Sequence, residues 1–337
     1  MNIKKTISFF TGDDPQIAKI RRWIGAALFA GLFIFLAFSL DWVEIWRVLK
    51  SVDPILLGVS CLLAFPYHLL IALSFKVITD RHDFKLSVGR IVWINLTILF
   101  YVIVLPASVV GSGMRLYRYA KFSNKPVEAF AAITYHKIFL NFIVILMSLC
   151  FLIFASVDQA QDSIFLVGGM VLVMAAVLLL IPRVSLLILR QIRQPETRVE
   201  NTSLVSFVRK YSLKTLKSFA EIGQMSLKDQ IKLSVLGLLA QMVHLGAYIL
   251  IARSIGIQTA IDQLSMIVAL VLLANNLPFN FSLGIGLREI SLGALLLAIG
   301  VDTTYAVAMP LVVFARSVFI GMVGGVLEGV QFLKERD

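Results

Sequence analysis

Charged side chains are scarce in this chain of 337 residues: Asp, Glu, Lys and Arg make up 15% of it, whereas hydrophobic residues make up 59%. The mean hydropathy is +0.89. Soluble globular domains usually contain about a quarter charged residues, so this composition excludes a water-soluble globular protein. The chain is therefore predicted to be an integral membrane protein.

Cysteine and histidine are also scarce, with two and four residues. Cys61 and Cys150 lie in apolar runs, where a thiol behaves as a small hydrophobic side chain, and no disulfide framework is predicted. His68 and His244 have no second ligand at metal spacing, so they are interpreted as packing residues and no metal site is predicted. The chain has no phosphate-binding loop, nucleophile elbow or dinucleotide fingerprint. No cofactor and no catalytic residue are predicted, and ATP-driven pumping by this chain alone is excluded.

Long apolar runs are what the chain has in abundance. Six of them have the roughly 20 residues that a membrane-spanning helix needs, at 23–40, 55–79, 127–155, 164–181, 231–253 and 303–327. Two further apolar stretches, 91–114 and 264–287, are interrupted by proline and glycines in their second half. The sequence predicts an all-α polytopic membrane protein that forms a single transmembrane domain over residues 1–337.

Basic residues are distributed unevenly between the connecting segments. Of the 31 Lys and Arg residues, 23 lie in segments 1–22, 80–90, 115–126, 182–230 and 328–337, and three lie in 41–54, 156–163, 254–263 and 288–302. The positive-inside rule places the first group, and with it both termini, on the cytoplasmic side of a bacterial inner membrane. Both ends of 91–114 then lie inside and both ends of 264–287 outside, so each stretch is predicted to be re-entrant. Full crossing stays open, because 24 helical residues reach about 36 Å.

The formal net charge of +11 favours anionic membrane lipids over nucleic acid as partners at this hydrophobicity. In the basic loop 182–230, apolar residues recur at near-helical spacing while the opposite face is basic, a pattern typical of a helix among lipid headgroups. The apolar positions are Leu204, Val208, Tyr211, Leu216, Phe219 and Ile222. A solvated connector whose charges determine topology is an equally good interpretation.

One motif occurs twice in the chain. Residues 105–115 read LPASVVGSGMR and residues 277–288 read LPFNFSLGIGLR. The shared positions are Pro106, Gly111, Gly113 and Arg115 in the first copy and Pro278, Gly284, Gly286 and Arg288 in the second. Three predicted spans separate the copies, so they enter from opposite faces under the predicted topology. Broken segments at matching places in two halves predict an inverted repeat with a central binding site.

The residues of this motif are therefore predicted to bind substrate. Pro106 and Pro278 interrupt helices, and non-helical backbone at membrane depth is tolerated where it lines a cavity. Arg115 and Arg288 present forked donors that suit phosphate. The alternative is that the glycines serve helix packing and each arginine extends to the interface, but the duplication favours binding.

Other polar residues within the apolar segments extend this prediction. His136, Lys137 and Asn276 are candidate substrate ligands because they lie in or beside predicted membrane segments. For Asn276, an equally good interpretation is that its side chain satisfies backbone carbonyls that Pro278 leaves free. Arg316 lies in the middle of the last span, where an isolated charge is costly. Glu289 is its predicted partner in a structural ion pair.

A longer pattern surrounds the second copy of the motif: Gly284-Ile-Gly286-Leu-Arg288-Glu289, Gly300-Val301, Ala306, Ala308 and Arg316. In these residues the chain resembles the flippase-like transmembrane domain of the lysylphosphatidylglycerol synthase (UPF0104) family, in a stand-alone form without the synthase domain. The order of spans and the basic loop are similar across nearly the whole chain, and the match is best in the second half. The first half departs from the family pattern, because Ser112 follows Gly111 where the family usually has a carboxylate. His136-Lys137 likewise replaces a frequent Glu-Arg pair.

The resemblance implies that the chain moves or binds a phospholipid or a polyprenyl-linked lipid in the inner membrane. An alternative function is an integral-membrane transferase acting on lipid-linked sugars, but such an enzyme needs a carboxylate and usually a metal at the interface, and residues 115–126 contain no acid. A second alternative is an accessory subunit of a separate lipid-modifying enzyme.

Overall fold

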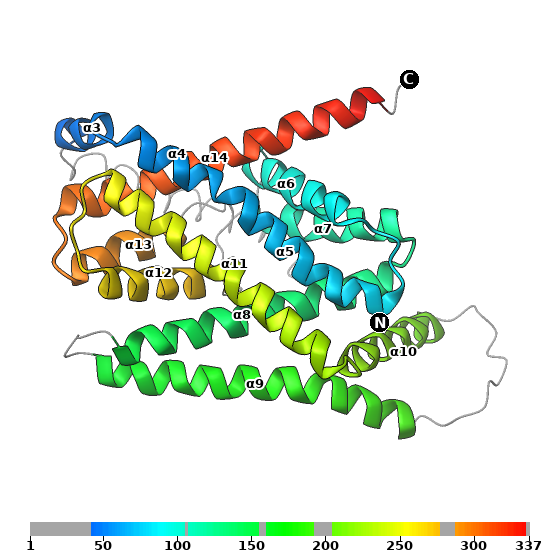
Figure 1. Cartoon of the computed structure of the whole chain (residues 1–337). Coiled ribbons are helices and arrows are strands. Elements are labelled where there is room, and N and C mark those ends of the chain that lie inside the picture. The colour runs from blue at the N-terminus through cyan, green and yellow to red at the C-terminus, as the bar shows by residue number, and fades with distance from the viewer. Residues whose placement is uncertain (1–41, 105–106, 155–159, 192–203, 277–286, 335–337) are drawn as a thin grey trace, which may run out of the picture. The chain divides into compact units, whose positions relative to one another are not determined.

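The computed structural model describes residues 42–104, 107–154, 160–191, 204–276 and 287–334 (Figure 1). These residues form helices and contain no strand, which confirms the predicted all-α class. The chain divides into two units, Met1–Lys50 and Ser51–Asp337. In the first unit, the described element is helix α3 (Trp42–Lys50), with an exposed ion pair between Glu44 and Arg47.

The second unit contains the remaining helices. In chain order they are α4 (Pro54–Leu62), α5 (Ala64–Thr79), the 3-10 turn η1 (Asp80–His82), α6 (Val88–Val104), α7 (Ala107–Ser123), α8 (Pro126–Phe154), α9 (Ala160–Gln191), α10 (Leu204–Gly223), α11 (Leu227–Ser254), α12 (Ile261–Asn276), α13 (Leu287–Ala298) and α14 (Thr303–Lys334).

Among the described residues, five helical stretches are long and apolar enough to cross a membrane. They are Pro54–His82, Pro126–Ile153, Val167–Leu189, Leu227–Ser254 and Thr303–Leu333. These stretches coincide with five of the six predicted spans, and the sixth, 23–40, lies outside the described residues. The shorter apolar helices Val88–Val102 and Ile261–Ala274 lie in the two stretches that proline and glycine interrupt.

Local sequence determines where the first of these spans begins. Asp53 caps α4, because its Oδ1 accepts hydrogen bonds from the backbone N–H groups of Ile55 and Leu56 at 2.8 and 3.2 Å. Pro54 at the first helical position fits this start, since its missing N–H would have no partner in the helix. The backbone N–H of Asp53 also donates to the carbonyl of Ser254 at 2.8 Å. This bond ties the start of α4 to the end of α11.

Helix contacts in the second unit occur in matched pairs. Helix α5 contacts α6 as α11 contacts α12; α6 contacts α7 as α12 contacts α13; and α7 contacts α8 as α13 contacts α14. Between the halves, α6 lies against α14 and α12 lies against α8, while α5 and α11 lie side by side (Figure 1). Helices α11, α12, α13 and α14 thus correspond to α5, α6, α7 and α8, and the contact of α6 with α14 corresponds to that of α12 with α8. This correspondence agrees with the duplicated sequence motif.

The structure corrects several predicted boundaries. Helix α7 begins at Ala107, so Gly111 and Gly113 lie inside a helix and do not interrupt it. The same helix continues to Ser123, through most of the predicted loop 115–126. Glycine disfavours a helix by only about 1 kcal/mol, which the packing of α7 against α6 and α8 offsets. Both Leu-Pro pairs lie outside the described residues, and so do Gly284 and Gly286 of the second copy.

Further predicted loops also contain helix. Helix α13 occupies most of 288–302, α9 continues through Pro182 to Gln191, and α14 continues to Lys334. The predicted helix in the basic loop is present as α10, and it packs against α8 and α9. Amphipathic and polar helices are missed by a search for long apolar runs, because their mean hydropathy is low.

Helices α6 and α14 approach each other unusually closely at two glycines. A Cβ atom at Gly324 would overlap the backbone carbonyl of Leu96, and one at Gly325 would lie 2.7 Å from the ring of Phe100. Small residues at helix interfaces in membranes permit this kind of close backbone contact. The side chains of Leu96 and Ile320 are buried next to it. This contact joins the first half of the fold to the last helix.

Candidate functional site

Aromatic and imidazole rings meet where α5 and α11 lie side by side. The ring centroid of Tyr67 is 4.6 Å from that of His244 and 5.0 Å from that of His68. His244 is in turn 5.4 Å from Tyr248 on the same helix. Tyr248 is 1% exposed and His68 is 8% exposed. These four side chains form the centre of a polar cluster, to which α4, α7, α8, α13 and α14 also contribute.

Arg316 of α14 is buried in this cluster, with 8% of its surface exposed. Its Nε donates a hydrogen bond to the backbone carbonyl of Ser60 in α4 at 2.9 Å. Its charge acts on Tyr67 and Tyr248 and repels Arg288. The Ser60 carbonyl of α4 thus holds the guanidinium of Arg316 near the tyrosines of α5 and α11.

Arg288, in the first turn of α13, lies on the α11 side of the cluster. It forms an ion pair with the neighbouring Glu289, in which Nε donates to Oε1 at 2.8 Å. Its Nη1 also donates to the hydroxyl of Ser317 in α14 at 3.3 Å, and its charge interacts with Tyr248. The side chains of Arg288 and Glu289 are 19% and 13% exposed.

Arg115 of α7 lies on the α5 side of the cluster. Its charge acts on His68, Tyr119 and His136. His136 is 6% exposed, and its Nε2 lies 2.8 Å from the hydroxyl of Ser74. The Nε atom of Arg115 is buried and has no hydrogen-bond partner among the described residues. A buried charged donor without a partner is costly, so this N–H is available to a bound acceptor.

The structure therefore brings together five of the thirteen predicted site residues, namely Arg115, His136, Arg288, Glu289 and Arg316. Arg115 and Arg316 both act on Tyr67 and His68, and Arg316 and Arg288 both act on His244. The three arginines of α7, α14 and α13 consequently form a series through the cluster, in which Arg316 is the middle member.

Other predicted ligands lie elsewhere. Lys137 is exposed although its neighbour His136 is buried, because adjacent residues of a helix point in different directions. Asn276 ends α12, and its side chain lies outside the described part. Gly113 is exposed, and a Cβ there would meet no described atom within 4 Å, so no described neighbour requires glycine for packing. Pro106, Pro278, Gly284 and Gly286 lie outside the described residues.

Sequence reasoning did not place four residues at the centre of the cluster. Tyr67 and Tyr248 were not predicted, and His68 and His244 were interpreted as packing residues, which agrees with their ring contacts. A signal was present, because each half of the repeat has one Tyr and one His in its first long helix, α5 or α11. Applying the duplication to these helices as well as to the Gly-x-Gly motif would have found them.

Glu289 pairs with Arg288 in the structure, whereas Arg316 donates to a backbone carbonyl. The sequence had paired Glu289 with Arg316, and that pairing stays a prediction. Glu289→Gln and Arg288→Gln are each expected to lower the unfolding free energy by about 3 kcal/mol, because each leaves one mostly buried charge without its partner. The double variant is expected to lose less than the sum of the two. Unfolding of the purified protein in detergent measures these losses.

The same single and double variants, with Arg316→Gln in place of Arg288→Gln, show which arginine pairs with Glu289. We expect the coupling energy between Glu289 and Arg288 to exceed that between Glu289 and Arg316. The opposite order would contradict the pair seen in the structure and support the one predicted from the sequence.

The cluster carries an excess of positive charge. Three guanidiniums, from Arg115, Arg288 and Arg316, lie in it, and Glu289 is the carboxylate that the described residues place beside them. Arginine is effectively always protonated in proteins. Two positive charges are therefore left without a carboxylate in the described part of the cluster. Forked guanidinium donors bind phosphate and carboxylate through two aligned bonds, so the cluster suits an anionic group of this geometry.

Comparison with known families identifies the architecture. The model of the lysylphosphatidylglycerol synthase TM region matches residues 22–325, which include both Gly-x-Gly-x-Arg motifs and Arg316. The chain belongs to this family. The resemblance seen in the Gly-x-Gly-x-Arg-Glu motif is thus confirmed. No curated protein and no solved structure matches the chain.

Membership of the lysylphosphatidylglycerol synthase TM-region family, together with the five long apolar helices, makes the chain a multi-pass protein embedded in the membrane. The family also indicates a lipid-related role in the membrane. Within the part of the chain that the structure describes, no group of three His, Cys, Asp or Glu side chains is placed to hold a metal ion. The functional question is therefore what the excess positive charge of the cluster binds.

Proposed function

We propose that the chain is an inner-membrane translocator of phospholipids or other phosphate-bearing lipids, and that Arg115, Arg288 and Arg316 bind the phosphate. The observation that carries this proposal is the charge of the cluster: three guanidiniums and one carboxylate lie together among helices apolar enough to span the membrane. The Nε of Arg115, which has no hydrogen-bond partner among the described residues, supplies a donor for a phosphate oxygen. Every phospholipid presents this group.

The physical reason is the cost of placing charge inside a bilayer. A phosphate headgroup that enters the hydrocarbon region without a counter-charge loses its hydration, and so does a buried guanidinium. When the two meet, each compensates the other, and their attraction is stronger than in water because the local dielectric constant is lower. Ionisable residues inside a membrane protein mark substrate pathways for this reason.

The duplication supports movement as well as binding. Arg115 and Arg288 occupy corresponding positions in the two halves, and Arg316 lies between them in the series of charges. Two similar halves that face opposite sides of the membrane offer similar paths to the centre from each leaflet. A headgroup can thus pass from one arginine to the next while it remains in contact with a positive charge.

The experiment that tests this function is a leaflet-resolved lipid assay on the purified protein in vesicles. We expect labelled phospholipid to exchange between leaflets faster than in protein-free vesicles. If lipid binds but does not exchange, the chain binds lipid without moving it, and the proposed translocation is wrong.

We also propose that 91–114 and 264–287 are re-entrant, and that both termini, 1–22 and 328–337, are cytoplasmic. Helix α6 has 17 residues and α12 has 16, so each reaches only about 25 Å at 1.5 Å per residue. A bilayer core is about 30 Å thick. The pairs α6/α7 and α12/α13 pack as neighbours, which supports entry and return on one face.

Cysteine accessibility tests this topology. In a chain with Cys61 and Cys150 replaced by serine, Arg90→Cys before α6 and Lys121→Cys near the end of α7 are expected to react with an impermeant thiol reagent from the same side. Asp302→Cys, before α14, is expected to react from the other side and serves as the control. All three positions are exposed in the structure. Reaction of positions 90 and 121 from opposite sides would contradict the re-entrant arrangement.

A further inference from the structure

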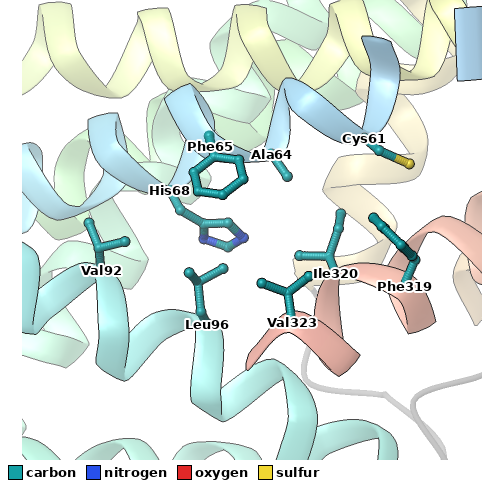
Figure 2. A pocket seen from close by; sticks show the side chains of 9 residues that line it. All are labelled: Cys61, Ala64, Phe65, His68, Val92, Leu96, Phe319, Ile320 and Val323. Atoms are coloured by element: carbon teal, nitrogen blue, oxygen red, sulfur yellow. The ribbon is translucent and has the colours of Figure 1, made fainter. Parts of the chain in front are cut away.

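A pocket lies between α4, α5, α6 and α14, and Figure 2 shows the side chains that line it. It contains about 360 Å³ of unfilled space, part of which is open to the surroundings. Its walls are mostly apolar and include Phe65 of α5, Leu96 of α6, and Phe319 and Val323 of α14. His68 is the one histidine among its lining residues, and Figure 2 shows its ring in the middle of the labelled side chains.

The outer end of the pocket lies among exposed apolar side chains. Phe65 is 63% exposed and Phe319 is 53% exposed. Both belong to helical stretches that are long and apolar enough to span a membrane, Pro54–His82 and Thr303–Leu333. Exposed aromatic residues on such helices face lipid hydrocarbon, because a contiguous apolar surface of this kind is unfavourable in water. The pocket therefore opens sideways toward the acyl chains of the bilayer.

The pocket lies close to Arg316. Cys61, a lining residue, follows Ser60, whose backbone carbonyl accepts a hydrogen bond from Nε of Arg316 at 2.9 Å. His68, another lining residue, lies within the electrostatic influence of both Arg115 and Arg316. Apolar walls, exposed aromatic side chains and nearby positive charge thus occur together at this pocket. This combination is complementary to an amphiphile that carries a phosphate on an apolar chain. A water-soluble phosphate would gain nothing from the apolar part.

We propose that this pocket holds an acyl chain of the lipid whose phosphate is bound by Arg115 and Arg316, so that the chain stays in the hydrocarbon region while the headgroup is inside the protein. This inference rests on the proposed function. It also explains how a lipid can be moved without exposing its chain to a polar cavity, since apolar surface is most stable among apolar atoms. It assigns the substrate to phospholipids with acyl chains and not to soluble phosphates.

The two native cysteines allow a test on the full, unmodified chain. Cys61 lines the pocket, whereas Cys150 is exposed on α8 and is not among the lining residues. With the protein in detergent, an uncharged thiol reagent is added and the modification of each cysteine is followed by mass spectrometry. Phosphatidylglycerol is expected to slow the modification of Cys61 by about tenfold when about nine sites in ten are occupied, and to leave Cys150 unchanged.

Three comparisons identify the ligand. Diacylglycerol with the same chains lacks the phosphate, inorganic phosphate lacks the chains, and neither is expected to protect Cys61. Arg316→Gln is expected to remove the protection by phosphatidylglycerol. If diacylglycerol protects Cys61 as well as phosphatidylglycerol does, or if Cys61 is not protected at all, the proposal is wrong, whatever the translocation assay shows.

A second variant tests the pocket during transport. Val323→Phe places a ring in the pocket and is expected to slow lipid exchange in vesicles by about tenfold, as overpacking of a filled site does. Val326→Phe, three residues further along α14 and 68% exposed, is the matched control and is expected to exchange lipid at the unmodified rate. Equal rates for the two variants would contradict the acyl-chain role. Protection of Cys61 without any lipid exchange in the unmodified protein would instead disprove translocation and leave the pocket as a lipid site.

Discussion

Arg115→Lys and Arg288→Lys are each expected to slow phospholipid exchange between the leaflets by at least about tenfold, without changing the amount of protein in the membrane. Lysine keeps the positive charge but cannot hold phosphate through two aligned bonds. The loss of one charge-assisted hydrogen bond costs about 1.5–3 kcal/mol, and each 1.36 kcal/mol in a barrier changes the rate tenfold. The measurement is leaflet-resolved exchange of a labelled phospholipid in reconstituted vesicles.

Arg183→Lys is the matched control, because it makes the same substitution at an exposed position of α9, away from the cluster. It is expected to exchange lipid at the unmodified rate. If Arg288→Lys also exchanges lipid at that rate, Arg288 does not bind phosphate, and its role is the structural one of pairing with Glu289. The two arginines are distinguished by their surroundings: Arg288 already has a carboxylate partner, whereas the described part of the chain offers no hydrogen-bond partner to Nε of Arg115.

Gly324→Ala is expected to destabilise the protein by about 3 kcal/mol, at the upper end of the effects of overpacking. The new methyl group would overlap the backbone carbonyl of Leu96, and a backbone atom cannot move aside as a flexible side chain can. Helices α6 and α14 would have to separate along the contact that also buries Ile320. The loss is measured as a fall in the unfolding temperature in detergent.

Gly329→Ala provides the matched control on the same helix. A Cβ at this position meets nothing within 4 Å, so the substitution adds no clash. Alanine favours the helix over glycine by about 0.5–1 kcal/mol, and the unfolding temperature is expected to stay the same or rise. A fall of equal size in both variants would contradict this account, because it would show that the loss at Gly324 does not come from the contact between α6 and α14.

The membrane character of the chain and the approximate places of its long helices could be predicted because they follow from one-dimensional quantities. The hydrocarbon core requires roughly 20 apolar residues for each spanning helix, and five such runs coincide with helices of the structure. The duplicated Gly-x-Gly-x-Arg motif could be found in the same way, by comparing the chain with itself. It led to Arg115 and Arg288, and both lie in the cluster.

Partners of charged groups could not be predicted, because they depend on contacts between distant segments. Arg118 was assigned to a cytoplasmic loop, yet it is 8% exposed and forms an ion pair with Glu328 of α14. Its Nη1 also donates to the hydroxyl of Thr97 at 3.2 Å. A glutamate 210 residues away in the chain cannot be recognised as a partner from spacing, since no local period links the two positions.

The sequence by itself therefore determined that this is an all-α membrane protein with two similar halves, each with an arginine after a Gly-x-Gly motif. The bilayer imposes the length of its helices, and duplication leaves a repeated pattern along the chain. Only the tertiary structure decided that Arg316 lies near both Tyr67 and Tyr248, that its Nε donates to the carbonyl of Ser60, and that the next residue, Cys61, lines an apolar pocket. The reason is that α5, α11 and α14 meet through packing, and packing depends on the shapes of whole helices and not on any short stretch of sequence.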